Sequence, residues 1–311
     1  MLSRAASSLY WLGRYIERAE FTSRLVEATL RLDAVSAPAI GAKAWEDALE
    51  VLGQKEAFEA TGAPLEQSAV TRFLTVDASN SGSVMCCLDA ARDNAKAVRI
   101  ALSRDAWSAI NRAWLLFRGV NNVGTNAAAI ELVERAEIET RAFEGSIGRM
   151  LKNPSSIFVR LGAVIERADG ISRLIDAKAD SLPDDPFAVA DVTVRDQWQM
   201  VLQAVSAVNA YRWVYREGLK PAAVIDLLAL RRELPRSLLA CAEEAVMYLN
   251  MLGKFTGQQG EADRWARQRA TLLKEAQINH LMGGHLVAFL HDFMASNLAL
   301  DKAISRQFRF H

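Results

Sequence analysis

The sequence predicts an all-α protein, an internally duplicated helical bundle with pseudo-twofold symmetry. Two observations support this prediction. Apolar residues make up 51% of the chain and only seven of its 311 residues are proline, a composition that favours helices and excludes a largely disordered protein. In addition, one stretch near the N-terminus recurs in the second half of the chain, with its apolar residues at helical spacing.

The repeated stretch is 17 residues long. Residues 12–28 read LGRYIERAEFTSRLVEA, and residues 161–177 read LGAVIERADGISRLIDA. Aligned without gaps at an offset of 149, ten of these 17 positions are identical, where composition alone gives about one. No long flexible linker separates the copies. We therefore expect one interlocked domain made of a first helical repeat, 1–152, and a second, 153–311.

The first half of the chain predicts six helices. The first covers residues 3–33, because apolar side chains recur at helical spacing at Leu9, Leu12, Ile16, Ala19, Val26 and Leu30. Turn-forming residues separate the others, which are expected over 44–59, 65–76, 82–102, 105–118 and 126–150. Residues 34–43 are expected to form a loop.

The second half predicts the same order of elements. Residues 155–179 form the copy of the first helix, and further helices are expected over 193–216, 221–230, 234–253, 260–281 and 285–307. Thr193 and Asp196 resemble a capping box at the start of one of them. The pair Gly283-Gly284 predicts a break before the last helix.

Charge and cysteine content exclude several classes of protein. The chain has 37 basic and 37 acidic residues, and this zero net charge argues against a nucleic-acid binder. No apolar stretch is long enough to span a membrane. Cys86, Cys87 and Cys241 form no disulfide framework, so a reducing, cytoplasmic location is expected. Because Cys-x-x-Cys and His-Glu-x-x-His are absent, no metal and no cofactor are predicted.

A charged stripe runs along the repeated helix. On a helical wheel, an arc about 80° wide holds six residues of each copy. The first four of each are Gly13, Glu17, Glu20, Arg24, Gly162, Glu166, Asp169 and Arg173, and the last two are Glu27 and Arg31 in the first copy and Asp176 and Asp180 in the second. Apolar and aromatic positions flank the stripe, so we expect this helix to be central and buried. Arg18 and Arg167 point about 100° away from the preceding glutamates.

The spacing within the stripe constrains its contacts. Adjacent Glu17 and Arg18 diverge, so each needs a separate partner if buried. Glu20–Arg24 is an i,i+4 pair in the favourable acid-first order, and Asp169–Arg173 repeats it. A glycine inside a helix costs about 1 kcal/mol relative to alanine. Its recurrence therefore predicts close approach by another backbone or by a bound molecule.

Two interpretations of the stripe are open. In the first, the charges form a symmetric buried ion-pair network that joins the two long helices. In the second, they form an open polar centre that binds a carboxylate- or phosphate-bearing molecule through Arg18, Arg24, Arg167 and Arg173. An enzyme built on this centre would use Glu17 or Glu166 as general base. No other catalytic group is identified.

Three segments resemble the bacterial alpha-E family, a helical domain named for its Glu-Arg motif. They are MLSRAASSLYWLGRYIERAEFTSRLVE at 1–27, CLDAARDNAKAVR at 87–99 and RLGAVIERADGISRLID at 160–176. Glu17-Arg18 and Glu166-Arg167 match the named motif. The resemblance covers essentially the whole chain.

The family resemblance implies a biological setting. Alpha-E proteins often stand beside, or are fused to, circularly permuted ATP-grasp ligases, and transglutaminase-like proteases are frequent neighbours. The resemblance therefore implies a non-catalytic helical accessory protein of a peptide or amide ligation system, with an ATP-grasp ligase as partner. The alternative is an enzyme or ligand-binding protein that uses the Glu-Arg centre.

Overall fold

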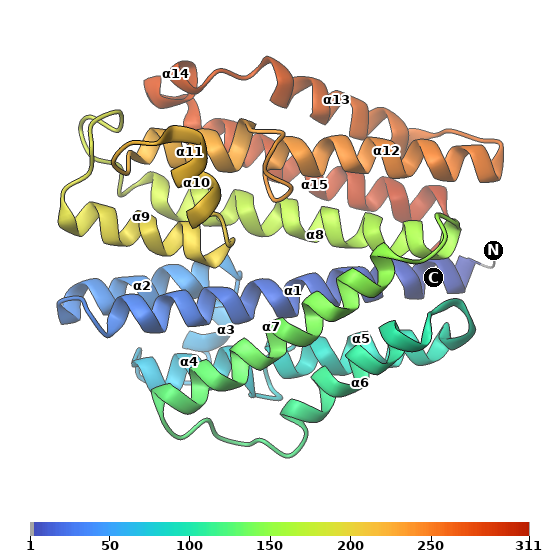
Figure 1. The fold of residues 1–311 in the computed structure, drawn as a ribbon, viewed down its shortest axis with the longest axis horizontal. Coiled ribbons are helices and arrows are strands. Elements are labelled where there is room, and N and C mark those ends of the chain that lie inside the picture. The colour runs from blue at the N-terminus through green and yellow to red at the C-terminus, as the bar shows by residue number, and fades with distance from the viewer. Residues whose placement is uncertain (1–2, 311) are drawn as a thin grey trace.

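The computed structural model describes residues 3–310, and every regular element in that range is helical. Two long helices, α1 (Ser3–Asp33) and α8 (Pro154–Ala179), lie side by side and run in the same direction through the middle of the molecule (Figure 1). Helix α1 is buried along most of its length, including charged residues such as Glu17 and Arg24. The expectation of a central, buried helix is confirmed.

The other helices of the first half cover one side of α1 (Figure 1). They are α2 (Pro38–Val51), α3 (Lys55–Glu59), α4 (Gln67–Thr75), α5 (Val84–Ala97), the 3₁₀ turn η1 (Arg99–Ala101), α6 (Arg104–Phe117) and α7 (Asn126–Gly148). Helices α5 and α7 pack directly on α1. Serine or threonine side chains cap α5, α6 and α7, which satisfies free backbone N–H groups.

The helices of the second half gather around α8 (Figure 1). They are α9 (Val192–Ala204), α10 (Val208–Tyr215), α11 (Pro221–Leu230), α12 (Leu238–Thr256), α13 (Glu261–Glu275), α14 (Ile278–His280), the π turn η2 (Leu281–His285) and α15 (Leu286–Gln307). Helices α12 and α15 pack directly on α8. The hydrophobic core is continuous through both halves and includes the fully buried Trp45 and Trp198.

Three predictions for the first half, one loop and two helices, are wrong. The expected loop at 34–43 contains the start of α2, because Pro38 at the first helical position presets the backbone for a helix. The expected helix at 44–59 is interrupted after Val51, where Gly53 adopts a positive φ of 63°. The expected helix at 82–102 is shorter, because α5 ends at Ala97 and a 3₁₀ turn follows.

The second half also differs from prediction. The expected helix at 193–216 is two helices, because Ser206 adopts a positive φ of 56° between them. Asp191, rather than Thr193, caps α9 by accepting a hydrogen bond from the backbone N–H of Val194. The helices expected at 234–253 and 260–281 cover 238–256 and 261–275.

The break predicted at Gly283-Gly284 is confirmed, since both residues leave the helical region of φ and ψ. Within residues 3–310, no helix combines the length and the apolar character that crossing a membrane requires.

Candidate functional site

The two central helices touch through their glycines. A Cβ atom added to Gly13 would lie 1.9 Å from the carbonyl oxygen of Val159. A Cβ atom added to Gly162 would lie 2.0 Å from the carbonyl oxygen of Tyr10. The close approach predicted from the recurring glycines is therefore an approach of two backbones. It brings the charged stripes of α1 and α8 within side-chain reach of each other.

The glutamate of each Glu-Arg pair binds the arginine of the other. Arg167 donates from Nε and Nη2 to Glu17, at 2.9 and 2.7 Å. Arg18 donates from Nε to Glu166 at 2.5 Å. Glu17 and Arg167 are buried, as is Glu166. Each charge thus has the separate partner that its position on the helix requires.

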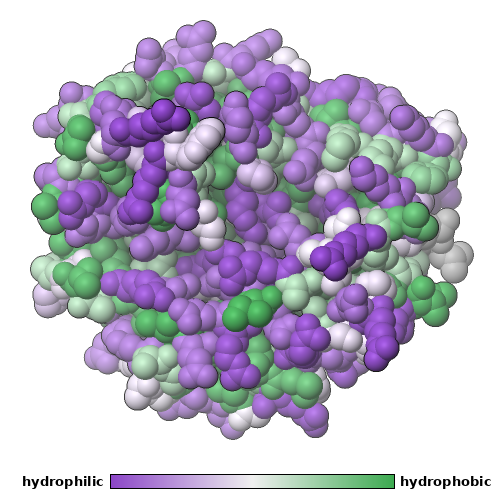
Figure 2. Space-filling view, viewed as in Figure 1, coloured by the Kyte–Doolittle hydropathy of each residue, from purple (hydrophilic) through white to green (hydrophobic). Residues whose placement is uncertain are grey.

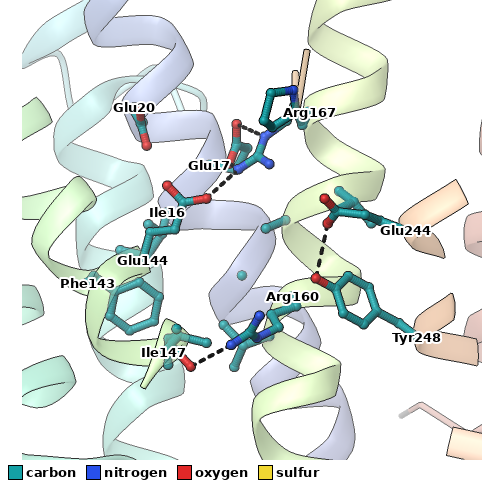
Figure 3. A pocket seen from close by; sticks show the side chains of 16 residues that line it. Ile16, Glu17, Glu20, Phe143, Glu144, Ile147, Arg160, Arg167, Glu244 and Tyr248 are labelled. Atoms are coloured by element: carbon teal, nitrogen blue, oxygen red, sulfur yellow. Dashed lines mark hydrogen bonds and ion pairs between the residues drawn. The ribbon is translucent and has the colours of Figure 1, made fainter. Parts of the chain in front are cut away.

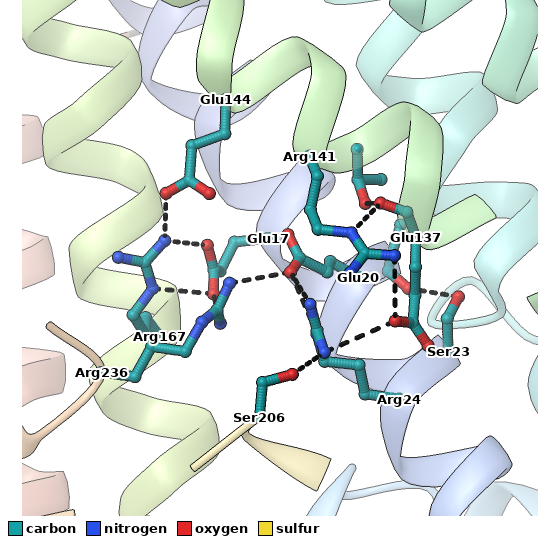
Figure 4. A network of polar contacts seen from close by, with 12 residues as sticks. Glu17, Glu20, Ser23, Arg24, Glu137, Arg141, Glu144, Arg167, Ser206 and Arg236 are labelled. Atoms are coloured by element: carbon teal, nitrogen blue, oxygen red, sulfur yellow. Dashed lines mark hydrogen bonds and ion pairs between the residues drawn. The ribbon is translucent and has the colours of Figure 1, made fainter. Parts of the chain in front are cut away.

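Glu17 and Glu20 share a further arginine. Arg236, in the turn before α12, donates from Nη1 to Glu17 and from Nη2 to Glu20, both at 2.8 Å (Figure 4). Arg24 donates to the same oxygen of Glu20 from Nε at 3.0 Å and from Nη2 at 2.9 Å, which confirms the predicted i,i+4 contact. Burial acts to raise the pKa of Glu17, but Arg167 and Arg236 outweigh it and lower this pKa to about 2.

Neighbouring side chains add further contacts on this side. Arg24 also donates to the hydroxyl of Ser206 and lies 3.4 Å from a carboxylate oxygen of Glu137. Arg167 also donates to Glu144 at 2.9 Å (Figure 4). We call this group, formed by Glu17, Glu20, Arg24, Glu137, Glu144, Arg167 and Arg236, the closed network.

The other side of the crossing is built differently. Glu166 accepts from Arg18 and, at 2.7 Å, from Nε of Arg14. Arg14 also donates to Asp301 at 2.8 Å, and the hydroxyl of Tyr10 donates to the same oxygen. Burial acts to raise the pKa of Glu166, but the two arginines outweigh it and lower this pKa. Both glutamates of the crossing are therefore held as carboxylates.

The predicted pair Asp169–Arg173 is also present. Nε of Arg173 donates to Asp169 at 2.8 Å. Arg173 is half-exposed, whereas Arg24 at the matching position of α1 is buried. The two copies of the stripe therefore differ in their exposure to solvent.

Each side of the crossing borders a cavity. One cavity, of about 230 Å³, lies between α1, α7, α8 and α12 beside Glu17 and Arg167. Figure 3 shows Glu144 on one side of it, and Glu244 with Tyr248 on the other. The Tyr248 hydroxyl donates to Glu244 at 3.0 Å. The second cavity, of about 320 Å³, lies beside Arg18, Glu166, Asp169 and Arg173.

The surface over this region is predominantly polar. Figure 2 shows hydrophilic side chains across the middle of the face on which α1, α7 and α8 lie, with apolar side chains scattered between them. Isolated apolar side chains on a surface are ordinary for a folded protein.

Two buried cysteines, Cys87 and Cys241, lie near the crossing. Burial raises the pKa of the Cys87 and Cys241 thiols to about 12, so both stay protonated and unreactive near neutral pH. Among residues 3–310, no group of three or more His, Cys, Asp or Glu side chains is arranged to hold a metal ion.

All ten residues predicted for the site lie at the α1–α8 crossing or beside it. Sequence reasoning missed the residues that complete the contacts, namely Arg14, Glu137, Glu144, Ser206, Arg236 and Asp301. Arg14 had one weak signal, its place one turn before Arg18, but Ala163 occupies its position in the copy. The other five residues lie outside the repeated stretches 12–28 and 161–177, so the repeat gives no signal for them.

Comparison with known proteins gives one match. The model of the Alpha-E family, described as "a predicted alpha-helical domain with a conserved ER motif", matches residues 1–308. No curated protein and no solved structure matches the chain.

Proposed function

Since the chain belongs to the Alpha-E family, we propose that it is a non-catalytic helical accessory protein of a peptide or amide ligation system. Its partner in this proposal is an ATP-grasp ligase, and a transglutaminase-like protease is a second candidate. The choice of partner rests on the gene neighbourhood that the family resemblance implies.

The crossed Glu-Arg pairs are the observation that supports a non-catalytic role. Each motif glutamate is buried and accepts hydrogen bonds from two arginines. A general base works best with a pKa near the operating pH, whereas the pKa values of Glu17 and Glu166 are lowered. These charges serve to join α1 to α8, which argues against the alternative in which either glutamate removes a proton from a substrate.

The same contacts support an origin by duplication, with a pseudo-twofold axis between α1 and α8. Matching positions in the two repeats differ by 149 in residue number. A twofold axis would exchange each residue of α1 with its match in α8. Under that exchange Gly13–Val159 corresponds to Gly162–Tyr10, and Glu17–Arg167 corresponds to Arg18–Glu166. We propose that residues 1–152 and 153–311 are the two repeats of one interlocked domain.

Co-purification tests the proposed partnership. The tagged protein is mixed with the ATP-grasp ligase encoded nearest to it, without nucleotide, with ADP and with ATP, and the mixtures are analysed by size-exclusion chromatography. We expect a stable complex in at least one nucleotide state. A tagged helical protein of similar size from another family is the control. Separate elution of the two proteins in all three conditions would contradict the proposal.

A further inference from the structure

We propose that the cavity beside Arg18 and Arg173 binds the oxyanion group of a small molecule, a carboxylate or a phosphate. The cavity has a volume of about 320 Å³ and lies between α1, α8 and the turn that follows α2. This site goes beyond the accessory role, because it would bind its ligand whether or not a ligase associates with the protein.

The arginines present free donors to this cavity. Arg18 is held at Nε by Glu166, at 2.5 Å, and Arg173 is held at Nε by Asp169, at 2.8 Å. The terminal amino groups of both guanidinium groups have no hydrogen-bond partner among residues 3–310. A carboxylate fixing Nε orients the planar group and leaves its outer edge free, which is the geometry that binds carboxylate or phosphate oxygens.

A buried hydroxyl in the same wall also lacks a partner. Thr22 lines the cavity and is fully buried, and its Oγ1 has no hydrogen-bond partner within the described chain. A buried polar atom without a partner costs about 1–3 kcal/mol, so a ligand oxygen that reached this hydroxyl would remove that cost. Gln54 adds an amide whose one contact, from Nε2 to the Leu52 carbonyl, is long at 3.5 Å.

The matching positions on the other side of the crossing show that these free donors are not a requirement of the fold. Arg167, which matches Arg18, uses Nε and Nη2 on Glu17 and Glu144. Arg24, which matches Arg173, binds Glu20 and Ser206 and contacts Glu137. Ile171 stands where the first copy has Thr22, so no hydroxyl is present there. Protein side chains on that side of the crossing therefore take up contacts that the terminal amino groups of Arg18 and Arg173 leave free.

Calorimetric titration with inorganic phosphate and, separately, with acetate tests the site at constant ionic strength. We expect at least one anion to bind, and the preferred one identifies the class of ligand. Removing one charge-assisted donor in R173M, or the hydroxyl in T22V, should weaken binding about tenfold. T22V keeps the side-chain shape and removes an unpaired hydroxyl, so its thermal stability should not fall.

The control is R135M, which removes an exposed arginine that lies 3.9 Å from its i,i+4 partner Glu131 on α7. It changes net charge by the same amount as R173M, and its binding should equal that of the unmodified protein. Absence of binding by both anions would overturn the proposal. So would R173M and T22V proteins that bind as tightly as the R135M protein.

Discussion

Glu17 and Glu137 belong to the same closed network, yet their pKa values shift in opposite directions. Two arginines at hydrogen-bond distance lower the pKa of Glu17 to about 2 despite its burial. Burial raises the pKa of Glu137 to about 7, helped by its contact with Glu27, while Arg24 and Arg141 lie 3.4 and 3.8 Å away and compensate only in part. Arginine geometry, more than depth of burial, thus separates these two carboxyl groups.

Replacing Glu17 with Gln is expected to lower the free energy of unfolding by about 3 kcal/mol, because it removes the buried carboxylate that Arg167 and Arg236 share. Urea denaturation of E17Q measures this loss. In the double variant E17Q/R167M, the loss should be smaller than the sum of the two single losses, since the partners share one interaction. Strictly additive losses, or an E17Q protein as stable as the original, would show that the crossed pair does not join the helices.

The raised pKa of Glu137 predicts a pH dependence with a definite sign. Between its ordinary value of 4.5 and about 7, the folded state keeps a proton that the unfolded state releases. The contribution of this group to stability is therefore present below pH 4.5 and is lost as pH rises to about 7. E137Q cannot titrate, so its stability relative to the original protein should increase with pH across this window. Parallel stability profiles from pH 4.5 to 8 would contradict this prediction.

At the scale of elements, glycines lower the helix propensity of the two central helices but allow the helices to cross closely. Gly13 and Gly162 each lie inside a continuous helix, where glycine is less favourable than alanine. The carbonyl groups of Val159 and Tyr10 occupy the space that a side chain at Gly13 or Gly162 would need. The crossing in turn brings the Glu-Arg pairs together, so backbone contact and ion pairing support each other.

A pair of glycine substitutions tests this crossing. G13A places a methyl group against the Val159 carbonyl and should lower the free energy of unfolding by about 3 kcal/mol, as overpacking does. G145A in α7 is the matched control, because nothing lies within 4 Å of the added atom. It should raise stability by about 1 kcal/mol through helix propensity. Thermal denaturation compares the two, and a stabilised G13A protein would refute the crossing.

Helix boundaries were predicted well where apolar periodicity is strong, as in α1 and α8, whose residues face the core at regular intervals. Helix boundaries were missed where the conformation of a single residue ends the helix. The end of α9 depends on Ser206, which takes a positive φ and binds Arg24 from a distant helix. A window of neighbouring residues holds no information about such a contact, so no local pattern reveals this boundary.

At the scale of the whole molecule, two segments of similar sequence meet in one centre whose sides have different environments. On one side Arg236, Glu144 and Glu137 complete the closed network. On the other side the terminal amino groups of Arg18 and Arg173 lie beside a cavity and have no hydrogen-bond partner among residues 3–310. The segments that supply the closing residues come from outside the repeated stretch, and the repeat alone does not reveal this difference.

Local residue patterns were sufficient to predict a helical protein, its two long central helices and the charged positions they carry, because periodicity and side-chain type act over a few residues. They also showed that Glu17 and Arg18 must find separate partners, since neighbours on a helix diverge. Which arginine each glutamate binds, and which arginines have further protein partners, depended on contacts between residues more than one hundred positions apart. Such contacts form only when the packed helices bring distant side chains together.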